Sequence, residues 1–396
     1  MKVTVVGFGQ CGGKIADEFV RINRTAINRR GIEICLGVYA VNTDAADLAG
    51  LHQIKDDYKH RILIGGNKTG GHGVGKINEL GALVTKEESA KIFDSIDGTK
   101  RLYETDAFLL AASGGGGTGS GAISVMTKLI KEHFSDKPVY DIVVLPFEHE
   151  EQTEERSTFN TAACLKSINA SADALFIYDN QRLGRKESAL NGNFTLNGNF
   201  TEINKEIVDP FYDLLCAGEE TNRKFIGSKT LDAGDIKQTL TGWTCMGFGR
   251  ADVPVFNFSF GKSGFASRNS QIAKGVQAME QALANLPLEC NAADAGRALF
   301  LVSGPAGEMN MEIVKEIGIR LRKIAPQATI RNGDYPREKD VIDVHIIFSA
   351  LSHLGKIREY YVKSSNLIKE YQRRRENLER DQREMGDLGK DIPALS

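Results

Sequence analysis

The stretch ASGGGGTGSGA, residues 112–122, decides the fold of this chain. Glycine fills six of the eight positions from Gly114 to Gly121, and the other two are Thr118 and Ser120. The run follows an apolar segment with β-strand character and precedes the amphipathic pattern AISVMTKLI. A flexible linker is not expected between a buried strand and such a helix. The order strand, glycine loop, helix instead predicts backbone amides that converge on phosphate oxygens, aided by the positive end of the helix dipole.

Short β-type runs and helical patterns alternate through the first half of the chain. We expect strands at 2–8, 35–41, 61–64, 107–112, 140–145 and 174–178, and helices at 12–23, 122–133 and 201–217, the last with a kink at Pro210. The alternation predicts an α/β fold with a doubly wound parallel sheet, which binds ligands at the carboxyl ends of its strands. The repeat LNGNF-T-LNGNF at 190–200 predicts a surface loop or hairpin, because Asn-Gly pairs favour tight turns.

The second half of the chain predicts a smaller α/β domain. Strands are expected at 297–302, 328–331 and 341–348, helices at 271–286 and 309–324, and core packing for Trp243. From 363 to 384 the chain is highly charged, and opposite charges four residues apart favour a helix. These expected pairs are Glu370/Arg374, Glu376/Arg380 and Glu379/Arg383.

The composition of the 396-residue chain is that of an ordinary globular protein, with 41% hydrophobic and 26% charged residues. A formal net charge of -2 gives no electrostatic argument for a nucleic-acid partner. No apolar run approaches the roughly 18–20 residues of a membrane span, so direct membrane insertion is not expected. The six cysteines are scattered, without a CxxC pair or a His cluster, which predicts no protein-bound metal and a cytoplasmic location.

The glycine loop GGGGTGSG at 114–121 resembles the phosphate-loop signature GGGTG[ST]G of the tubulin/FtsZ superfamily. Other matches follow in family order over roughly residues 1–350. GQCGG at 9–13 is similar to the tubulin version of the first loop, and NTDAADL at 42–48 to an FtsZ loop. TLDAGDIKQ at 230–238 resembles the catalytic loop of FtsZ. With GHGVG and GDYPR, this mixture of loops looks most like CetZ, the archaeal tubulin-like group.

The resemblance implies that GTP or GDP is bound by the glycine loops, with Mg2+ held mainly through the nucleotide. Phosphate contacts are implied for Gly9, Gln10, Cys11, Gly12, Gly13, Gly115, Gly116, Gly117, Thr118 and Gly119. The stretches 42–44 and 71–75, with Asn42, Asp44, Gly71 and Gly73, would approach the β/γ end and its Mg2+. Lys14, at the first helix turn, would meet either phosphate or solvent. Glu150, with Glu151 as the alternative, would meet the ribose, and Arg156 would lie nearby. Asn180 and Asn204 would read the guanine edge, since an amide offers both a donor and an acceptor.

Asp232 and Asp235 are the implied hydrolysis residues. Two carboxylates three positions apart at a helix start share one face and can order an attacking water, or a cation with its water, at the terminal phosphate. From the residues alone, Asp232 fits a cap on a helix beginning near Ala233 equally well. Thr230 stands where the family usually has asparagine.

The resemblance also implies a domain order and an assembly. Residues 1–200 would form the GTP-binding domain, 201–228 the central helix and its connection, 229–360 a C-terminal domain that begins with the catalytic loop, and 361–396 a charged helical extension and tail. In a head-to-tail homopolymer, the next subunit's loop would hydrolyse each nucleotide, so that assembly stimulates the GTPase. A role in cell shape or division is implied, and the tail KDIPALS resembles a peptide by which FtsZ binds membrane adaptors.

Two other function classes stay open from the sequence. The first loop, Gly7 to Gly13, fits GxGxxG, but the acidic candidate Asp44 lies 32 residues past Gly12, whereas an NAD-binding fold places it about 20 residues on. An NAD-dependent oxidoreductase is therefore one rival. The loop at 65–76 is not a P-loop, because Ile77 stands where Ser or Thr ligates Mg2+. The other rival is a filament regulator that binds GTP without turnover, and the presence of both aspartates argues against it.

Overall fold

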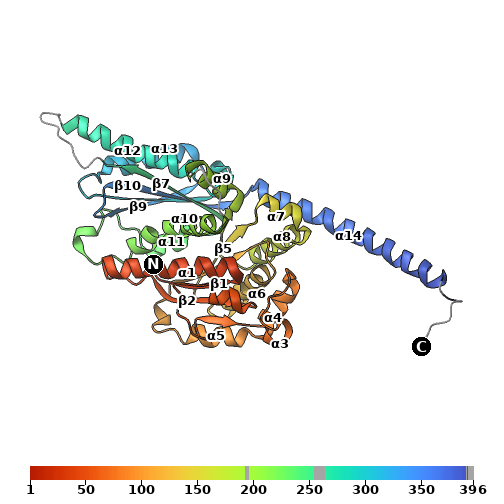
Figure 1. The fold of residues 1–396 in the computed structure, drawn as a ribbon. Coiled ribbons are helices and arrows are strands. Elements are labelled where there is room, and N and C mark those ends of the chain that lie inside the picture. The colour runs from red at the N-terminus through yellow and green to blue at the C-terminus, as the bar shows by residue number, and fades with distance from the viewer. Residues whose placement is uncertain (192–195, 254–263, 389, 391–396) are drawn as a thin grey trace.

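A computed structural model describes the chain except residues 192–195, 254–263, 389 and 391–396 (Figure 1). Within the described residues, the centre is a ten-stranded sheet with the order β3-β2-β1-β4-β5-β6-β7-β10-β8-β9. The strands are β1 (Val3–Phe8), β2 (Cys35–Asn42), β3 (Arg61–Leu63), β4 (Ala107–Ser113), β5 (Val139–Leu145), β6 (Ala174–Asp179), β7 (Gly242–Asp252), β8 (Arg297–Gly304), β9 (Thr329–Pro336) and β10 (Val341–Leu351).

The first six strands are parallel, as the alternation predicts. Successive side chains point to opposite faces, so Val5 joins the core on one face of the sheet and Val6 the core on the other. Because all six strands run the same way, their ends form two distinct edges. The carboxyl edge is where they end, at Phe8, Asn42, Leu63, Ser113, Leu145 and Asp179; the amino edge is where they begin, at Val3, Cys35, Arg61, Ala107, Val139 and Ala174.

Helices cover both faces of the sheet (Figure 1). One face carries α1 (Gly9–Arg30), α2 (Ala45–Ala49), α9 (Asn180–Asn191), α10 (Leu196–Ala217) and α11 (Ala233–Thr239). The other carries α4 (Asn78–Glu87), α5 (Ser89–Asp97), α6 (Thr118–His133), α8 (Glu155–Asn169), α12 (Gly264–Ala284), α13 (Met311–Ile324) and the start of α14 (Gly355–Leu388). Short helices α3 (Gly66–Thr69) and α7 (Glu148–Thr153), and 3-10 turns at Leu102–Glu104, Arg223–Phe225 and Ala292–Asp294, complete the described elements.

The sheet continues into the second half of the chain through β7, which the sequence reading missed. β7 pairs in parallel with β6 and antiparallel with β10, which leads to β8 and β9. Its glycines conceal the strand pattern and have a packing reason. A Cβ at Gly247 would lie 2.1 Å from the Ala282 carbonyl oxygen, so only glycine lets α12 approach this closely. Trp243, at the start of β7, is half-buried against the core. The proposed domain boundaries stay a prediction.

The expected loop or hairpin at 190–200 is wrong where the structure describes it. α9 extends to Asn191, and α10 begins at Leu196. Residues 192–195 lie outside the described part. α10 therefore starts five residues before the expected helix at 201–217, and Pro210 lies inside it without ending it. The result is a 22-residue helix, about 33 Å long, that crosses the body from one edge of the parallel strands toward the other.

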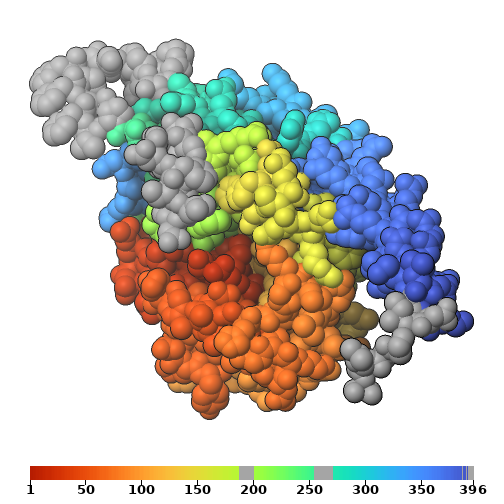
Figure 2. All heavy atoms as spheres, turned by 45° about the vertical axis from the view of Figure 1, so that its right-hand side comes forward, coloured from red at the N-terminus to blue at the C-terminus, as the bar shows by residue number. Residues whose placement is uncertain are grey.

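α14 leaves the body as a long charged helix (Figure 1). In Figure 2 its first part lies beside the segment that carries α7 and α8. Lys363 pairs with Glu151 at 3.0 Å, and the Tyr371 hydroxyl donates to Glu155 at 2.8 Å. The expected pair Glu370–Arg374 forms, at 2.6 Å. In the described part of the chain, no helix combines the length and apolar character needed to cross a bilayer.

Candidate functional site

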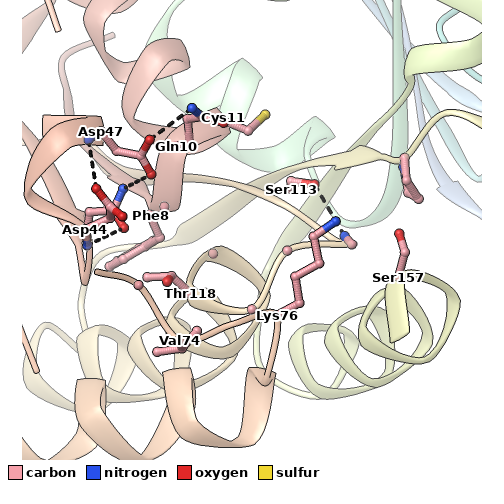
Figure 3. Close-up of a pocket in the computed structure, with 18 of the residues that line it drawn as sticks. Phe8, Gln10, Cys11, Asp44, Asp47, Val74, Lys76, Ser113, Thr118 and Ser157 are labelled. Atoms are coloured by element: carbon pink, nitrogen blue, oxygen red, sulfur yellow. Dashed lines mark hydrogen bonds between the residues drawn. The ribbon is translucent and has the colours of Figure 1, made fainter. Parts of the chain in front are cut away.

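A cavity of about 530 Å3 opens at the carboxyl edge of the parallel strands (Figure 3). Its volume lies in the range of small-molecule sites. The glycine loops that follow β1 and β4 line it together with the loop after β2, with Asn180 at the start of α9 and with Phe200 and Asn204 of α10. The predicted site residues in the lining are Gly9, Gln10, Cys11, Lys14, Asn42, Asp44, Gly73, Gly115, Gly116, Gly117, Thr118, Gly119, Glu150, Asn180 and Asn204.

The loop after β4 presents the N-terminus of α6 to this cavity. α6 begins at Thr118, so its first amides have no partner within the helix and carry the positive end of its dipole. The Thr118 hydroxyl lies 2.6 Å from that of Thr43, which fixes it at the cavity wall. Gly119 has no room for a side chain, because a Cβ there would lie 2.9 Å from the Phe8 carbonyl oxygen. The arrangement is suited to an anion.

The loop after β1 passes directly into α1. Gly9 has a φ of +69°, a left-handed conformation that favours glycine. Gly12 and Gly13 are buried in α1 and do not line the cavity; a Cβ at Gly12 would lie 2.1 Å from the Ala111 carbonyl oxygen. Gly12 therefore lets α1 pack closely against β4, whereas Gly13 lies beside Leu51 and Ala40 at ordinary contact distance. Cys11 does line the cavity, and burial raises the pKa of its thiol to about 12.

An acidic corner forms where the loop after β2 meets α1 (Figure 3). Asp44 caps α2 by accepting from the amides of Ala46 and Asp47. Asp47 accepts from Gln10 at 2.9 Å and from Asn42 at 3.1 Å. Burial raises the pKa of the Asp47 carboxyl above its ordinary value. Asp47 was not among the predicted residues, although its motif NTDAADL contains it.

The loop at 65–76 is joined to the loop after β2 by backbone hydrogen bonds. Ala45 donates to the Gly71 carbonyl at 3.0 Å, and Gly73 donates to the Thr43 carbonyl at 3.1 Å. Gly71 itself lies outside the lining and holds this junction. At the far end of the loop, Lys76 pairs with Glu154, and both residues line the cavity. The sequence reading did not assign Lys76 or Glu154 to the site.

The other end of the cavity carries polar amides and an aromatic ring. Asn180 begins α9 and Asn204 lies on α10; each is only 8% exposed. Phe200 lines the same end, one helical turn before Asn204, and packs edge-on against Phe147. Its spacing of four residues from Asn204 was a usable signal, but the loop expected at 190–200 obscured it. Val74 and Gly75 also line the cavity and belong to the stretch 71–75 that the resemblance places near the phosphates. The remaining lining residues missed from the sequence are Phe8, Ser113, Pro146 and Ser157.

Glu150, Glu151 and Arg156, which the resemblance places near the ribose, lie in three different environments. Glu150 lines it and accepts from the Phe147 amide at 2.8 Å. Glu151 instead faces α14, where it pairs with Lys356 and Lys363. Arg156 is exposed, pairs with Glu79 at 3.3 Å and does not line the cavity. The geometry therefore favours Glu150 over Glu151 as the residue next to a ligand.

Asp232 and Asp235 lie at the opposite, amino edge. Two residues after Asp235, Lys237 pairs with Asp106, which immediately precedes β4. Asp232 is exposed and caps α11, accepting from the Asp235 amide at 2.8 Å. The Asp235 carboxylate pairs with Arg331 at 3.2 Å. α10 separates the two regions: from Asn204 at the cavity to Ala217 near this loop is thirteen residues, or about 20 Å of helix axis.

Comparison with known proteins agrees with this architecture. A model of the Tubulin/FtsZ family GTPase domain matches residues 2–186, and one of the tubulin-like CetZ C-terminal domain matches residues 194–365. The chain is 31% identical to tubulin-like protein CetZ1 of Haloferax volcanii over 91% of this chain and 90% of the relative. It is 28% identical to CetZ of Pyrococcus abyssi over 97% of this chain and 95% of the relative.

Solved structures show the same fold. The GDP-bound monomer of CetZ1 from Haloferax volcanii superposes with a TM-score of 0.78 at 29% identity, covering 93% of this chain and 99% of that one. The CetZ2 structure from the same organism, a GTPγS-bound protofilament, gives a TM-score of 0.77 at 24% identity, covering 94% and 100%.

Proposed function

The chain belongs to the CetZ group of the Tubulin/FtsZ family, a family of GTPases, and from this premise we propose that it is a filament-forming GTPase whose hydrolytic site is completed between subunits. The observation that carries the proposal is the separation of two half-sites on one chain. The cavity opens at the carboxyl edge, and the acidic pair Asp232 and Asp235 lies at the amino edge.

The cavity suits a guanine nucleotide with its phosphates on the glycine loops. The free amides at the start of α6 favour the phosphates, and Thr118 adds a hydroxyl at the same wall. Asn180 and Asn204 would hydrogen-bond the base edge, with Phe200 offering an apolar contact beside them. The relative solved with GDP bound, at 29% identity, supports guanine-nucleotide binding here.

Mg2+ would be held chiefly by the nucleotide's own phosphates. No cluster of three or more metal-binding side chains occurs in the described residues, which fits an ion that takes few protein ligands. Asp44 is the carboxylate best placed to approach it through water, since it lines the cavity beside the phosphate loops. When bound, the ion would neutralise charge on the phosphates.

Hydrolysis would need a second subunit. A water aligned for attack lies within about 3–3.5 Å of the phosphorus atom. About 20 Å of α10 lies between Asn204 at the cavity and Ala217 near the loop that carries Asp232 and Asp235 in the same chain. Stacking one subunit's amino edge on the next subunit's carboxyl edge would bring the pair over the nucleotide. There Asp235 would orient the water, while Asp232 keeps α11 and the loop in place as its cap.

The proposed cellular setting is the cytoplasm, with the chain itself as principal partner and a role in cell shape or division. At 24% identity, the CetZ2 protofilament supports the fold, and the case for assembly rests on the two half-sites. An adaptor at the tail stays a prediction, because residues 391–396 lie outside the described part. The family match disfavours the dehydrogenase alternative.

The steady-state GTPase rate tests this function. If hydrolysis requires contact between subunits, the rate rises faster than linearly with protein concentration and falls away in dilute solution. A rate strictly proportional to concentration down to dilute protein contradicts the proposal. Binding of GTP measured beside binding of NAD, in the same assay, separates the proposed activity from the oxidoreductase alternative.

A further inference from the structure

Two of the glycine loops meet back to back behind the cavity. A Cβ at Gly117 would lie 2.7 Å from the Val74 side chain and 2.8 Å from the Ile77 amide nitrogen. The backbone of the loop after β4 therefore packs at Gly117 directly against the Val74 side chain and the backbone at Lys76 and Ile77. Lys76, at this junction, has a φ of 60°, an uncommon conformation for a residue with a side chain. Something must hold the two loops in this arrangement.

Asn160 of α8 lies directly behind the junction. Its side chain is fully buried and does not line the cavity. The Nδ2 group lies within hydrogen-bond distance of three backbone carbonyl oxygens: Lys76 at 3.0 Å, Gly115 at 3.2 Å and Gly116 at 3.3 Å. Because the group has two N–H bonds, one of them is shared between two carbonyls. One amide thus joins the loop after β4 to the loop at 65–76. The opposite orientation of the amide is excluded by chemistry, because Oδ1 would then face three acceptor oxygens.

These hydrogen bonds set the direction of the loop's own amides. In a planar trans peptide, the C=O of one residue and the N–H of the next point in opposite directions. Holding the Gly115 and Gly116 carbonyls toward Asn160 therefore turns the amides of Gly116 and Gly117 away from α8. Both residues line the cavity, whereas Asn160 does not. Ser120 supports the same orientation, since its hydroxyl also donates to the Gly116 carbonyl.

We propose that Asn160 is a positioning residue for the phosphate site, which presets the two peptide planes and joins the two glycine loops before any nucleotide arrives. The inference rests on the proposed GTP-binding function. It assigns to α8 a role that the sequence motifs do not mark, because Asn160 belongs to none of the glycine loops. The Oδ1 atom has no hydrogen-bond partner among the described residues, so the buried side chain acts through its donor alone.

The test compares Asn160→Asp, which keeps the shape and removes the donor, with Asn160→Ala and the matched control Thr161→Val. Thr161 is equally buried on the same helix, but its hydroxyl donates only within α8. We expect about a tenfold or greater loss of GDP affinity in both Asn160 variants, with guanosine binding unchanged and Thr161→Val like the wild type. Circular dichroism and thermal melting identify any variant that fails to fold. If Asn160→Asp fails to fold, the affinity of Asn160→Ala alone decides the test.

Amide hydrogen exchange in the nucleotide-free proteins separates this inference from the proposed function. Faster exchange at 115–119 and 76–77 in the Asn160 variants, with the rest of the chain unchanged, supports the positioning role. A folded Asn160 variant with wild-type exchange at these loops, or with GDP affinity within twofold of the wild type, overturns it. A wild-type protein that binds no guanine nucleotide overturns the proposed function instead, and the exchange comparison still decides the role of Asn160.

Discussion

The carboxyl and amino edges of the same six strands are built in different ways. The carboxyl edge is hollow, and its glycine loops leave backbone amides directed at a cavity. The amino edge is closed by ion pairs: Lys2 with Glu104 at 2.6 Å, and Lys237 with Asp106 at 3.3 Å. On that closed surface, Asp232 remains exposed. Under the proposed function, one edge would hold a nucleotide and the other would present carboxylates to a nucleotide held by a second subunit.

Removing the carboxylate at the amino edge gives the largest expected effect. Asp235→Ala lowers the GTPase rate of assembled protein by about 100-fold or more, in the range of lost acid–base or water-orienting groups. GTP binding and sedimentation of polymer stay near wild type, because the cavity is unchanged. The control is Asp381→Ala, which removes an exposed carboxylate of α14 far from both edges. An Asp235→Ala protein that hydrolyses GTP at the wild-type rate contradicts the role of this edge.

A negative charge placed at the carboxyl edge is expected to weaken GTP binding, whereas the change at the amino edge affects hydrolysis. Thr118→Glu lowers GTP affinity by about 100-fold or more, because a carboxylate among phosphate oxygens adds like-charge repulsion. The helix N-terminus tolerates an acidic residue, so the fold is expected to persist. Thr118→Val is the matched control, which removes only the hydroxyl and costs about tenfold at most. Calorimetric titration with GTP checks both variants, and unchanged affinity in Thr118→Glu shows that the phosphates lie elsewhere.

Base recognition at the far end of the cavity contributes a smaller amount. Asn204→Ala is expected to weaken GTP binding by about tenfold, the cost of losing hydrogen bonds to the base. Because the lost contacts are to the guanine edge, the preference for GTP over ATP falls with it. Asn366→Ala, an exposed amide on α14, is the control. If Asn204→Ala weakens GTP and ATP equally, Asn204 does not read the base.

The last expected effect concerns the stability of the fold rather than the nucleotide, and it involves α10, the helix that connects the two edges. His345, on β10, lies next to this helix, with its Nε2 3.6 Å from Asp213 of α10. Burial lowers the pKa of His345 to about 3. Between pH 6.5 and about 3, the unfolded chain binds a proton at this histidine and the folded chain does not. His345 thus lowers the free energy of unfolding by about 1.4 kcal/mol for each pH unit of acidification.

Replacing that histidine isolates its share of the pH dependence. His345→Leu loses less stability on acidification than the wild type, measured by urea unfolding at pH 7, 6 and 5. His353→Leu, an exposed histidine at 83% side-chain accessibility, keeps the wild-type slope. Equal slopes for His345→Leu and wild type show that His345 titrates in the folded protein.

The sequence predicts the carboxyl edge better than the rest of the molecule. Strand–loop–helix order places Gly9, Thr118 and Asn42 together, since the carboxyl ends of parallel strands meet. Contacts to backbone atoms leave no motif in the sequence. Asn160 contacts backbone carbonyls of two other loops, and Gly247 is glycine because α12 packs closely against it. Phe200 was missed because the Asn-Gly pairs at 190–200 led to the prediction of a loop, although the four-residue spacing from Phe200 to Asn204 is typical of a helix. The opposite placement of Asp232 follows from α10: its stretch from Asn204 to Ala217 lies within the helix that the sequence predicts at 201–217, but the position of that helix across the sheet is shown only by the structure.

Mixing two defective proteins tests the central claim most directly. Asp235→Ala retains a sound cavity, and Thr118→Glu retains a sound acidic pair. In a mixed polymer, an Asp235→Ala subunit supplies an intact cavity, and a neighbouring Thr118→Glu subunit supplies an intact Asp235. If hydrolysis occurs between subunits, each contact of this kind restores a complete site. The account predicts that the mixture hydrolyses GTP well above the sum of the two proteins assayed alone. A rate equal to that sum, with the two proteins shown to co-assemble, contradicts it.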